Sequence, residues 1–221
     1  CDPMKSALLA IAALVASVFF ATPASATYGV DVSAPYDANS FKCLVDNSWE
    51  FAIVRGFQSF GACDPNAPGT IRAAWDGGMA HVDTYLFPCR GKDATSQVNE
   101  LFSCLSGVKF GQVWLDIETN PSDGCGWGSD YSANCNYIGE MLRAVEAHGV
   151  RPGVYASPYM WGIIAGSGCT VGSSYPLWWA DYNGVAGWPP FSPFGGWSSP
   201  AIHQYDDSGS TCGVSFDQNY Y

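Results

Sequence analysis

The sequence has few charged residues, and basic residues are the scarcer kind. Lysine and arginine number 9 against 20 aspartate and glutamate residues, which gives a formal net charge of -11 over 221 residues. A nucleic-acid binder must neutralise phosphates with basic side chains, so this balance argues against a nucleic-acid partner. The same negative charge disfavours electrostatic capture by anionic membranes or cell walls at neutral pH.

Long apolar runs are also scarce. The one extended run, residues 7–20, follows Lys5 and precedes the small residues Ala24-Ser25-Ala26. This pattern is typical of a secretory signal, so we expect residues 1–26 to be a prefix and signal peptide and residues 27–221 to be one domain. The run is too short for a membrane anchor. We therefore expect secretion into the extracellular space or a digestive or phagolysosomal lumen, with no membrane association once the signal is removed.

Motifs for metal-dependent and nucleophilic chemistry are missing. The sequence contains no Cys-x-x-Cys pair, no HExxH, no G-x-S-x-G and no phosphate-binding glycine loop. We therefore expect neither a metal ion nor an organic cofactor.

Cysteines, in contrast, are plentiful. Residues 27–221 contain eight, an even number that in an exported chain predicts four disulfides. Eight cysteines allow about 105 connectivities, and the sequence does not choose among them. The eight are Cys43, Cys63, Cys89, Cys104, Cys125, Cys135, Cys169 and Cys212.

Short apolar, β-branched runs alternate with helical patterns over the first two thirds of the chain. Residues 134–150, for example, place Ile138, Met141, Leu142 and Val145 on one helical face. Five strand-helix units of this kind predict a parallel sheet covered by helices. Three further strands, near residues 176–182, 201–206 and 213–220, follow one another too closely for helices and are separated by the predicted loops 183–200 and 207–212. The fold class is therefore α/β, a single-domain TIM-like barrel with incomplete helical cover, (β/α)5(β)3.

Carboxylates occur where several of these strands end. Asp116 and Glu118 are two positions apart and therefore share one face of their strand. Asp31, Asp181 and Asp217 reach the same rim from other strands. Carboxylates crowded at a barrel mouth raise one another's pKa, and a raised pKa suits a general acid near neutral pH. Each acid alone also has a structural interpretation, such as a helix cap or a turn.

Aromatic and amide side chains gather at the same strand ends. Sugars stack on aromatic rings, and amides and carboxylates bind their hydroxyl groups. Trp178 and Trp179 face opposite ways, so at most one lines the mouth; packing in the core is the alternative for each ring. The predicted sugar-binding residues are Tyr85, Phe87, Tyr155, Trp179, Asp181, Tyr182 and Gln204.

The order of these motifs resembles a known family. The segments "DVS", "WLDIE", "GVYAS" followed by Trp161, "LWWADY", "HQY" and "FDQNYY" closely resemble the family 25 glycoside hydrolases, which are N-acetylmuramidases. The similarity runs from Tyr28 to the C-terminus and implies a barrel with five helices and three bare strands. It also implies a monomer that acts on bacterial peptidoglycan.

The resemblance assigns roles to four acids by position. Glu118 matches the general acid that protonates the glycosidic oxygen. Asp116 matches the second carboxylate, which either attacks as a nucleophile or orients the substrate's own acetamide. Asp31 and Asp217 match further active-site acids, to which we assign pKa tuning and sugar contacts.

Two other readings of the barrel remain. A chitinase also ends its fourth strand in carboxylates, but it shows a longer D-x-x-D-x-D-x-E run, where this chain has Gly111, Val113 and Trp114. A catalytically inactive sugar-binding barrel would predict loss of the acid, yet Glu118 and Asp116 are both present.

Overall fold

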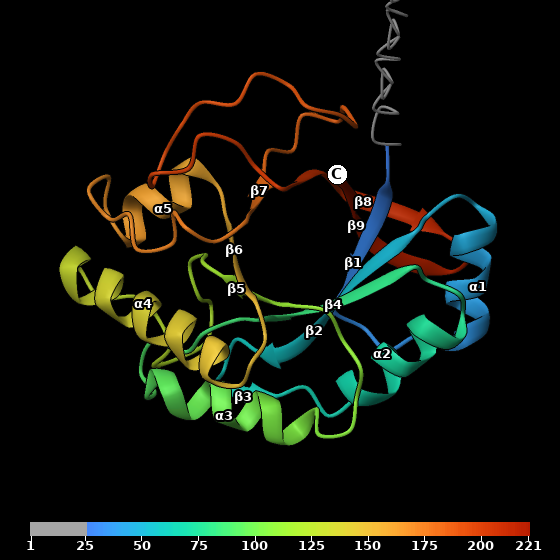
Figure 1. Cartoon of the computed structure of the whole chain (residues 1–221), viewed down its shortest axis with the longest axis horizontal. Helices are drawn as coiled ribbons and strands as arrows, with labels where there is room; N and C mark the ends of the chain where they lie inside the picture. The colour runs from blue at the N-terminus through green and yellow to red at the C-terminus, as the bar shows by residue number, and fades with distance from the viewer. Residues whose placement is uncertain (1–25) are drawn as a thin grey trace, which may run out of the picture.

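The computed structural model describes residues 26–221. Residues 1–25 of the predicted prefix and signal peptide therefore lie outside the described residues. Within this part of the chain eight strands close into a barrel and five helices pack against its outer wall (Figure 1). The predicted (β/α)5(β)3 barrel is thereby confirmed. The strands are β1 (Tyr28–Val32), β2 (Phe51–Gln58), β3 (Ala62–Cys63), β4 (His81–Leu86), β5 (Val113–Asp116), β6 (Pro152–Ala156), β7 (Leu177–Ala180), β8 (Ile202–Thr211) and β9 (Val214–Tyr220), and the helices are α1 (Ala38–Asp46), α2 (Ala67–Asp76), α3 (Ala94–Cys104), α4 (Tyr131–Ala147) and α5 (Pro158–Ile164).

The barrel strands follow the order β1-β9-β8-β7-β6-β5-β4-β2, and β2 closes the barrel by pairing with β1. Neighbouring strands are parallel except at β9, which runs antiparallel to both β8 and β1. The short β3 lies outside the barrel and pairs antiparallel with β2. Because the first seven barrel strands are parallel, their carboxyl ends meet at one rim, and β9 starts from that rim.

The β8–β9 hairpin corrects one predicted loop. Residues 207–212 were predicted to be a loop, but β8 continues through them to Thr211 and pairs with β9. The two connecting residues, Cys212 and Gly213, have φ angles of 62° and 72°, as a tight two-residue hairpin turn requires. The serine and glycine residues of this segment are typical of a loop, but its hydrogen-bonded pairing with β9 makes it a strand. The predicted loop at residues 183–200 contains no helix or strand, which confirms it.

Side-chain caps set several helix boundaries. The Asp130 side chain accepts a hydrogen bond from the Ala133 amide, so α4 begins at Tyr131, three residues before the predicted start. The predicted apolar face of α4 is buried. The fifth predicted helix follows β6. It is α5, a seven-residue helix that starts with Pro158 after the capping Ser157.

Aromatic rings fill the interior of the barrel. Its central cluster consists of Phe51, Ile53, Trp114, Tyr155, Trp178, Ala180 and Ile202. Two glycines make room for the largest rings: a Cβ atom on Gly29 would lie 2.2 Å from the Phe51 ring, and one on Gly153 would lie 2.4 Å from the Trp114 ring. A larger core lies between the barrel wall and the helices.

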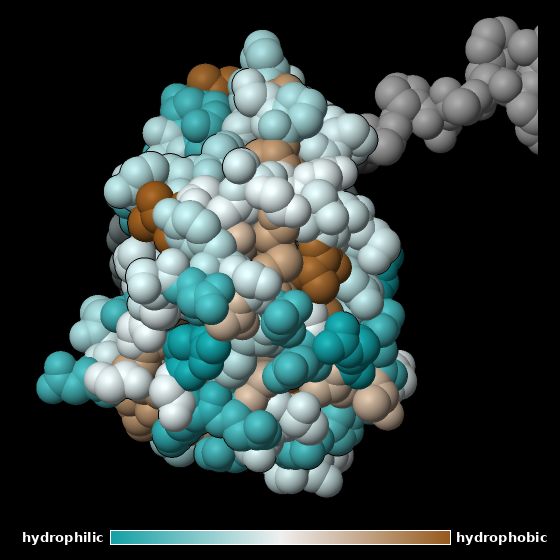
Figure 2. Space-filling model, turned by 90° about the vertical axis from the view of Figure 1, so that its left-hand side faces the viewer, coloured by the Kyte–Doolittle hydropathy of each residue, from teal (hydrophilic) through white to brown (hydrophobic). Residues whose placement is uncertain are grey.

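The outer surface is mixed in character. Figure 2 shows that the face carrying α4 and α5 is largely hydrophilic, with scattered apolar atoms. In residues 26–221, moreover, none of the helices has the length and apolarity needed to cross a membrane.

Four disulfides connect the eight cysteines, as predicted. Cys43–Cys212 links α1 to the β8–β9 turn, and Cys63–Cys104 links β3 to α3. Cys89–Cys125 joins the loops that follow β4 and β5, and Cys135–Cys169 ties α4 to the loop after α5.

We expect the disulfide with the longest loop to stabilise the fold most. Cys43–Cys212 spans 169 residues and Cys135–Cys169 spans 34. In the loop-entropy model this difference corresponds to about 1.4 kcal/mol. The double variant Cys43→Ala/Cys212→Ala should therefore lose about 2–5 kcal/mol of unfolding free energy, more than Cys135→Ala/Cys169→Ala. Urea denaturation of both variants tests this, and the reverse order would contradict it.

Candidate active site

Acidic side chains from three strands meet at the rim formed by the carboxyl ends of the parallel strands. Asp116 is the last residue of β5, and Glu118 follows two positions later. Asp31 in β1 is the register partner of Asp217 in β9. Asp217 is the middle residue of β9, and its pairing with Asp31 brings it to the same rim as the other acids.

These acids line a cavity of about 240 Å³ at the barrel mouth. All four predicted catalytic acids and five of the seven predicted sugar-binding residues line it. A larger cavity of about 480 Å³ lies at the opposite end of the barrel, where stability rather than catalysis is usual. The predicted residues in the mouth cavity are Asp31, Tyr85, Phe87, Asp116, Glu118, Tyr155, Tyr182, Gln204 and Asp217.

A hydrogen-bond network holds the acids of β1 and β9. The Gln204 Nε2 atom donates to Asp31 Oδ2 at 2.7 Å and to Asp217 Oδ2 at 3.2 Å. Asn219 Nδ2 also donates to Asp31 Oδ2, at 2.8 Å. The Tyr155 hydroxyl donates to Gln204 Oε1 at 2.6 Å, which fixes the orientation of the amide. These bonds position Asp31 and Asp217 before any substrate binds.

Asp116 is held differently. Only 7% of the residue is exposed, and its buried Oδ1 atom has no hydrogen-bond partner among residues 26–221. A buried polar atom without a partner is costly, and such atoms are concentrated at functional sites. This oxygen is therefore available to a bound ligand.

The pKa values of all four acids are raised. Burial, and then the neighbouring Asp217, raise the pKa of Asp31 to about 8. Burial and the Glu118 charge raise the pKa of Asp116 well above its usual range. Burial and Asp217 also raise the pKa of Glu118. Burial, with Asp207 and Asp206, raises the pKa of Asp217 to about 6. The site therefore retains protons at a pH at which exposed carboxyl groups have lost them.

Asp31 should destabilise the fold as the pH rises. In the unfolded chain the Asp31 carboxyl group has a pKa near 4, whereas in the folded protein its pKa is about 8. Protonated Asp31 therefore contributes fully to the free energy of unfolding below pH 4, and this contribution is lost as the pH rises through about 8. Asp31→Asn keeps a neutral side chain at every pH. We expect it to be more stable than the wild type by on the order of 2 kcal/mol at pH 8, with little difference at pH 4. Thermal unfolding at both pH values tests this.

The exposed Asp76, at the end of α2, provides the control for that measurement. Asp76→Asn removes the same formal charge outside the site. An equal, pH-dependent gain in both variants would contradict a specific effect of Asp31.

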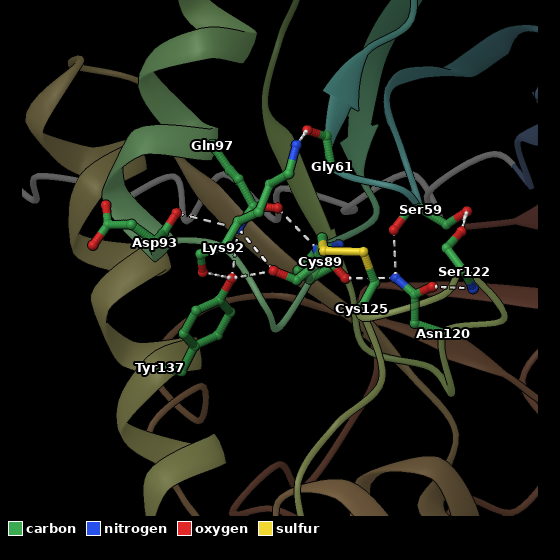
Figure 3. Close-up of a disulfide and its surroundings, with 11 residues drawn as sticks. Ser59, Gly61, Cys89, Lys92, Asp93, Gln97, Asn120, Ser122, Cys125 and Tyr137 are labelled. Atoms are coloured by element: carbon green, nitrogen blue, oxygen red, sulfur yellow. Dashed lines mark hydrogen bonds between the residues drawn. A yellow bond between two sulfur atoms is a disulfide. The ribbon is translucent and has the colours of Figure 1, made fainter.

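The backbone that carries Glu118 is fixed by its loop. Trp127 Nε1 donates to the Glu118 carbonyl oxygen at 2.7 Å. Two residues after Glu118, Asn120 Nδ2 donates to the carbonyl oxygens of Ser59, at 2.6 Å, and Pro88, at 2.9 Å. The Cys89–Cys125 disulfide lies beside this network and ties the same loops together (Figure 3). These contacts hold the loop that carries Glu118 in place.

Two predicted sugar-binding residues, Trp179 and Asp181, do not line this cavity. Trp179 packs outside the barrel. Its ring centroid lies 5.1 Å from that of Phe191 and 4.7 Å from that of His203, on which it is stacked. Asp181 does not line the cavity; its Oδ2 atom accepts a hydrogen bond from Asn183. Trp178, on the other face of β7, lines the cavity instead.

Three further cavity residues were missed in addition to Trp178. They are Ser33, Arg55 and Ser59. Alternation along β2 could have indicated Arg55, because it shares a face with the interior residues Phe51 and Ile53. Ser33 belongs to the "DVS" segment, whereas Ser59 had no signal in the sequence.

Comparisons with known proteins place the chain in a family. Residues 22–205 match the family model described as Lysozyme-like protein 1. The probable GH family 25 lysozyme 4 of Dictyostelium discoideum is 42% identical over 196 residues, which cover 87% of this chain and 89% of that protein. The chain belongs to glycoside hydrolase family 25. The recognition made from the sequence motifs is thereby confirmed.

Another relative and a solved structure support the same placement. Lysozyme-like protein 5 of Caenorhabditis elegans is 34% identical, with 92% of this chain and 95% of that protein covered. Among solved structures, a family GH25 lysozyme from Aspergillus fumigatus superposes with a TM-score of 0.74 at 20% identity, covering 89% of this chain and 94% of that one. At this identity the structural likeness shows that the family 25 barrel is shared.

Proposed function

We propose that this protein is a lysozyme that hydrolyses the β-1,4 bond between N-acetylmuramic acid and N-acetylglucosamine in bacterial peptidoglycan. The observation that carries the proposal is the pair Asp116 and Glu118, two carboxyl groups with raised pKa values in one cavity at the barrel mouth. Membership of family 25 and the relatives named lysozymes support it. Glycosidases generally use two carboxyl groups that flank the scissile bond.

In this mechanism each acid has one task. Glu118, whose pKa is raised by burial and by Asp217, donates its proton to the glycosidic oxygen as the bond breaks. Asp116, as the carboxylate after it has given up its own proton, either attacks the anomeric carbon or orients the substrate acetamide to do so, and its unpaired Oδ1 is available for both roles. A water molecule then attacks the anomeric carbon of the resulting intermediate, and Glu118, now acting as base, takes the proton of that water. Asp217 raises the pKa of Glu118, Asp31 raises that of Asp116, and both contact the sugar. Tyr85, Phe87, Tyr155, Tyr182 and Gln204 supply stacking surfaces and hydrogen bonds.

The cellular setting follows from the same features. Four disulfides fit an oxidising compartment, so we propose a secreted enzyme that acts in an extracellular, digestive or phagolysosomal lumen. We propose that residues 27–221 form the single catalytic domain and act as a monomer, without a metal or organic cofactor.

A comparison of two polymers tests the proposed activity. Release of soluble fragments is measured from purified peptidoglycan and from chitin, across acidic and neutral pH. We expect release from peptidoglycan and at least about 100-fold slower release from chitin, since substrates are discriminated by differences in transition-state binding. Faster release from chitin would favour a chitinase. Binding without cleavage of either polymer would favour an inactive sugar-binding barrel.

A further inference from the structure

One charged residue of the cavity has no role in the proposed hydrolysis. Arg55 is the only lysine, arginine or histidine among the thirteen described residues that line the cavity, where it lies with four carboxyl groups. It points into the barrel from the same face of β2 as Phe51 and Ile53, and its register partner is Tyr85. Its side chain is 27% exposed, so a ligand in the cavity can reach it.

Asp64 holds the guanidinium by one edge. The Arg55 Nε and Nη2 atoms lie 3.0 and 2.9 Å from Asp64 Oδ2. Within residues 26–221, Asp64 is the only carboxylate in salt-bridge contact with Arg55, and Nη1 has no hydrogen-bond partner there. The four acids of the cavity therefore leave the free edge of the guanidinium to a ligand.

Asp64 is itself fixed in place. It is 3% exposed, its amide donates to the Gly56 carbonyl oxygen at 2.9 Å, and its Oδ1 atom accepts from the Asn66 amide at 3.0 Å. The preceding residue, Cys63, is bonded to Cys104 in α3. Asp64 thus fixes the orientation of the Arg55 guanidinium before any ligand arrives, and this lowers the entropy cost of binding.

We propose that the free edge of Arg55 binds the carboxylate of an acidic sugar, namely the lactyl carboxylate of N-acetylmuramic acid on glycan strands without stem peptides. This inference rests on the proposed function. A guanidinium forms its strongest hydrogen bonds with carboxylates. Each of the four carboxyl groups repels an anionic sugar once it is ionised, and Arg55 supplies the opposite charge. N-acetylglucosamine has no carboxylate, so Arg55 would favour muramyl residues over the units of chitin.

The test compares two tetrasaccharides of alternating N-acetylglucosamine and N-acetylmuramic acid. One carries free lactyl carboxylates, and in the other these are neutral methylamides. The measured quantity is the ratio of kcat/KM for the charged and the neutral substrate. We expect Arg55→Gln to lower this ratio by about 10- to 100-fold, the range typical of a charge-assisted hydrogen bond.

Two further variants separate recognition from folding. Arg55→Gln alone leaves the buried Asp64 charge without its partner, which destabilises folds. Arg55→Gln/Asp64→Asn removes both charges and keeps polar groups in both places, so its ratio should fall as well. Arg151→Gln removes one positive charge at the opposite end of the barrel and should leave the ratio unchanged. An unchanged ratio in both Arg55 variants would overturn the proposal, because a purely structural Arg55 would slow both substrates equally.

Binding distinguishes this proposal from the proposed function. Calorimetric titration of the wild type and the double variant with both tetrasaccharides requires no turnover. One outcome is that the wild type cleaves neither sugar but binds the charged sugar more tightly than the neutral one, while the double variant shows no such preference. In that case the lysozyme proposal fails and carboxylate recognition stands. If binding shows no preference for the charged sugar, the Arg55 proposal is overturned whatever the activity.

Discussion

Glu118→Gln is expected to lower kcat on peptidoglycan by about 1,000-fold, within the range for loss of a general acid. The amide has nearly the same shape as the protonated acid but cannot donate its proton to the glycosidic oxygen. The fold should remain intact, because the change removes a buried ionisable group whose charge is disfavoured by burial and by Asp217. Initial rates of fragment release and thermal unfolding of the same preparation measure both effects.

The exposed Glu140 of α4 provides the matched control. Glu140→Gln should keep wild-type rates. A Glu118→Gln variant whose kcat is within about tenfold of the wild-type value would exclude Glu118 as the acid.

The pH dependence of wild-type activity gives a second check on Glu118, and the direction of the change is defined. Because the raised pKa keeps Glu118 protonated above the usual glutamate range, wild-type activity should fall as the pH rises through that pKa.

Asp116→Asn should lower kcat by about 100- to 10,000-fold while leaving the fold intact. Both proposed roles require a carboxyl group that can carry negative charge as the glycosidic bond breaks, and an amide cannot do so. Asp116 is buried with a pKa far above normal, so a neutral amide there should not reduce stability at neutral pH. Rates and melting temperatures are measured beside Asp76→Asn, which changes an exposed aspartate and should be silent. Near-normal rates in Asp116→Asn would remove Asp116 from the mechanism.

The two roles of Asp116 can be separated with an altered substrate. A muramyl glycan whose 2-acetamido group is replaced by a hydroxyl cannot use its own acetamide as a nucleophile. If Asp116 attacks directly, the wild type should still cleave this glycan. If Asp116 orients the acetamide, cleavage should stop while binding persists.

Alternation along β7 and the two residues after it explains why Trp179 and Asp181 lie outside the cavity. Residues two apart in a strand share a face, so Trp178, Ala180 and Tyr182 form one set and Trp179 and Asp181 the other. Predicting Trp179 and Tyr182 together therefore combined two faces. The inward face is the one that carries Trp178, whose register partner Tyr155 also lines the cavity. Strand periodicity showed that only one tryptophan could point inward, but choosing between them required the register between strands.

Features set by local sequence were predicted well, and those set by distant contacts were not. The order of strands and helices, and the arrival of four acids at one rim, follow from short periodic patterns and the geometry of parallel strands. Disulfide pairing does not, since Cys43 and Cys212 are separated by 169 residues and meet only after the barrel closes. Arg55 is a different case, because alternation along β2 could have indicated its inward position and its partner Asp64 is only nine residues away. Its role depends on Asp64, and the turn that brings the two together is formed by β3 outside the barrel.

The identity of the newly formed reducing end tests the lysozyme proposal most directly. Purified peptidoglycan is digested by the protein, the products are reduced with borohydride, and each soluble fragment is identified by mass spectrometry, with Glu118→Gln in parallel. The proposal predicts reduced N-acetylmuramic acid at the new ends and none in the variant digest. Reduced N-acetylglucosamine at those ends, or equal product from the variant, would contradict it.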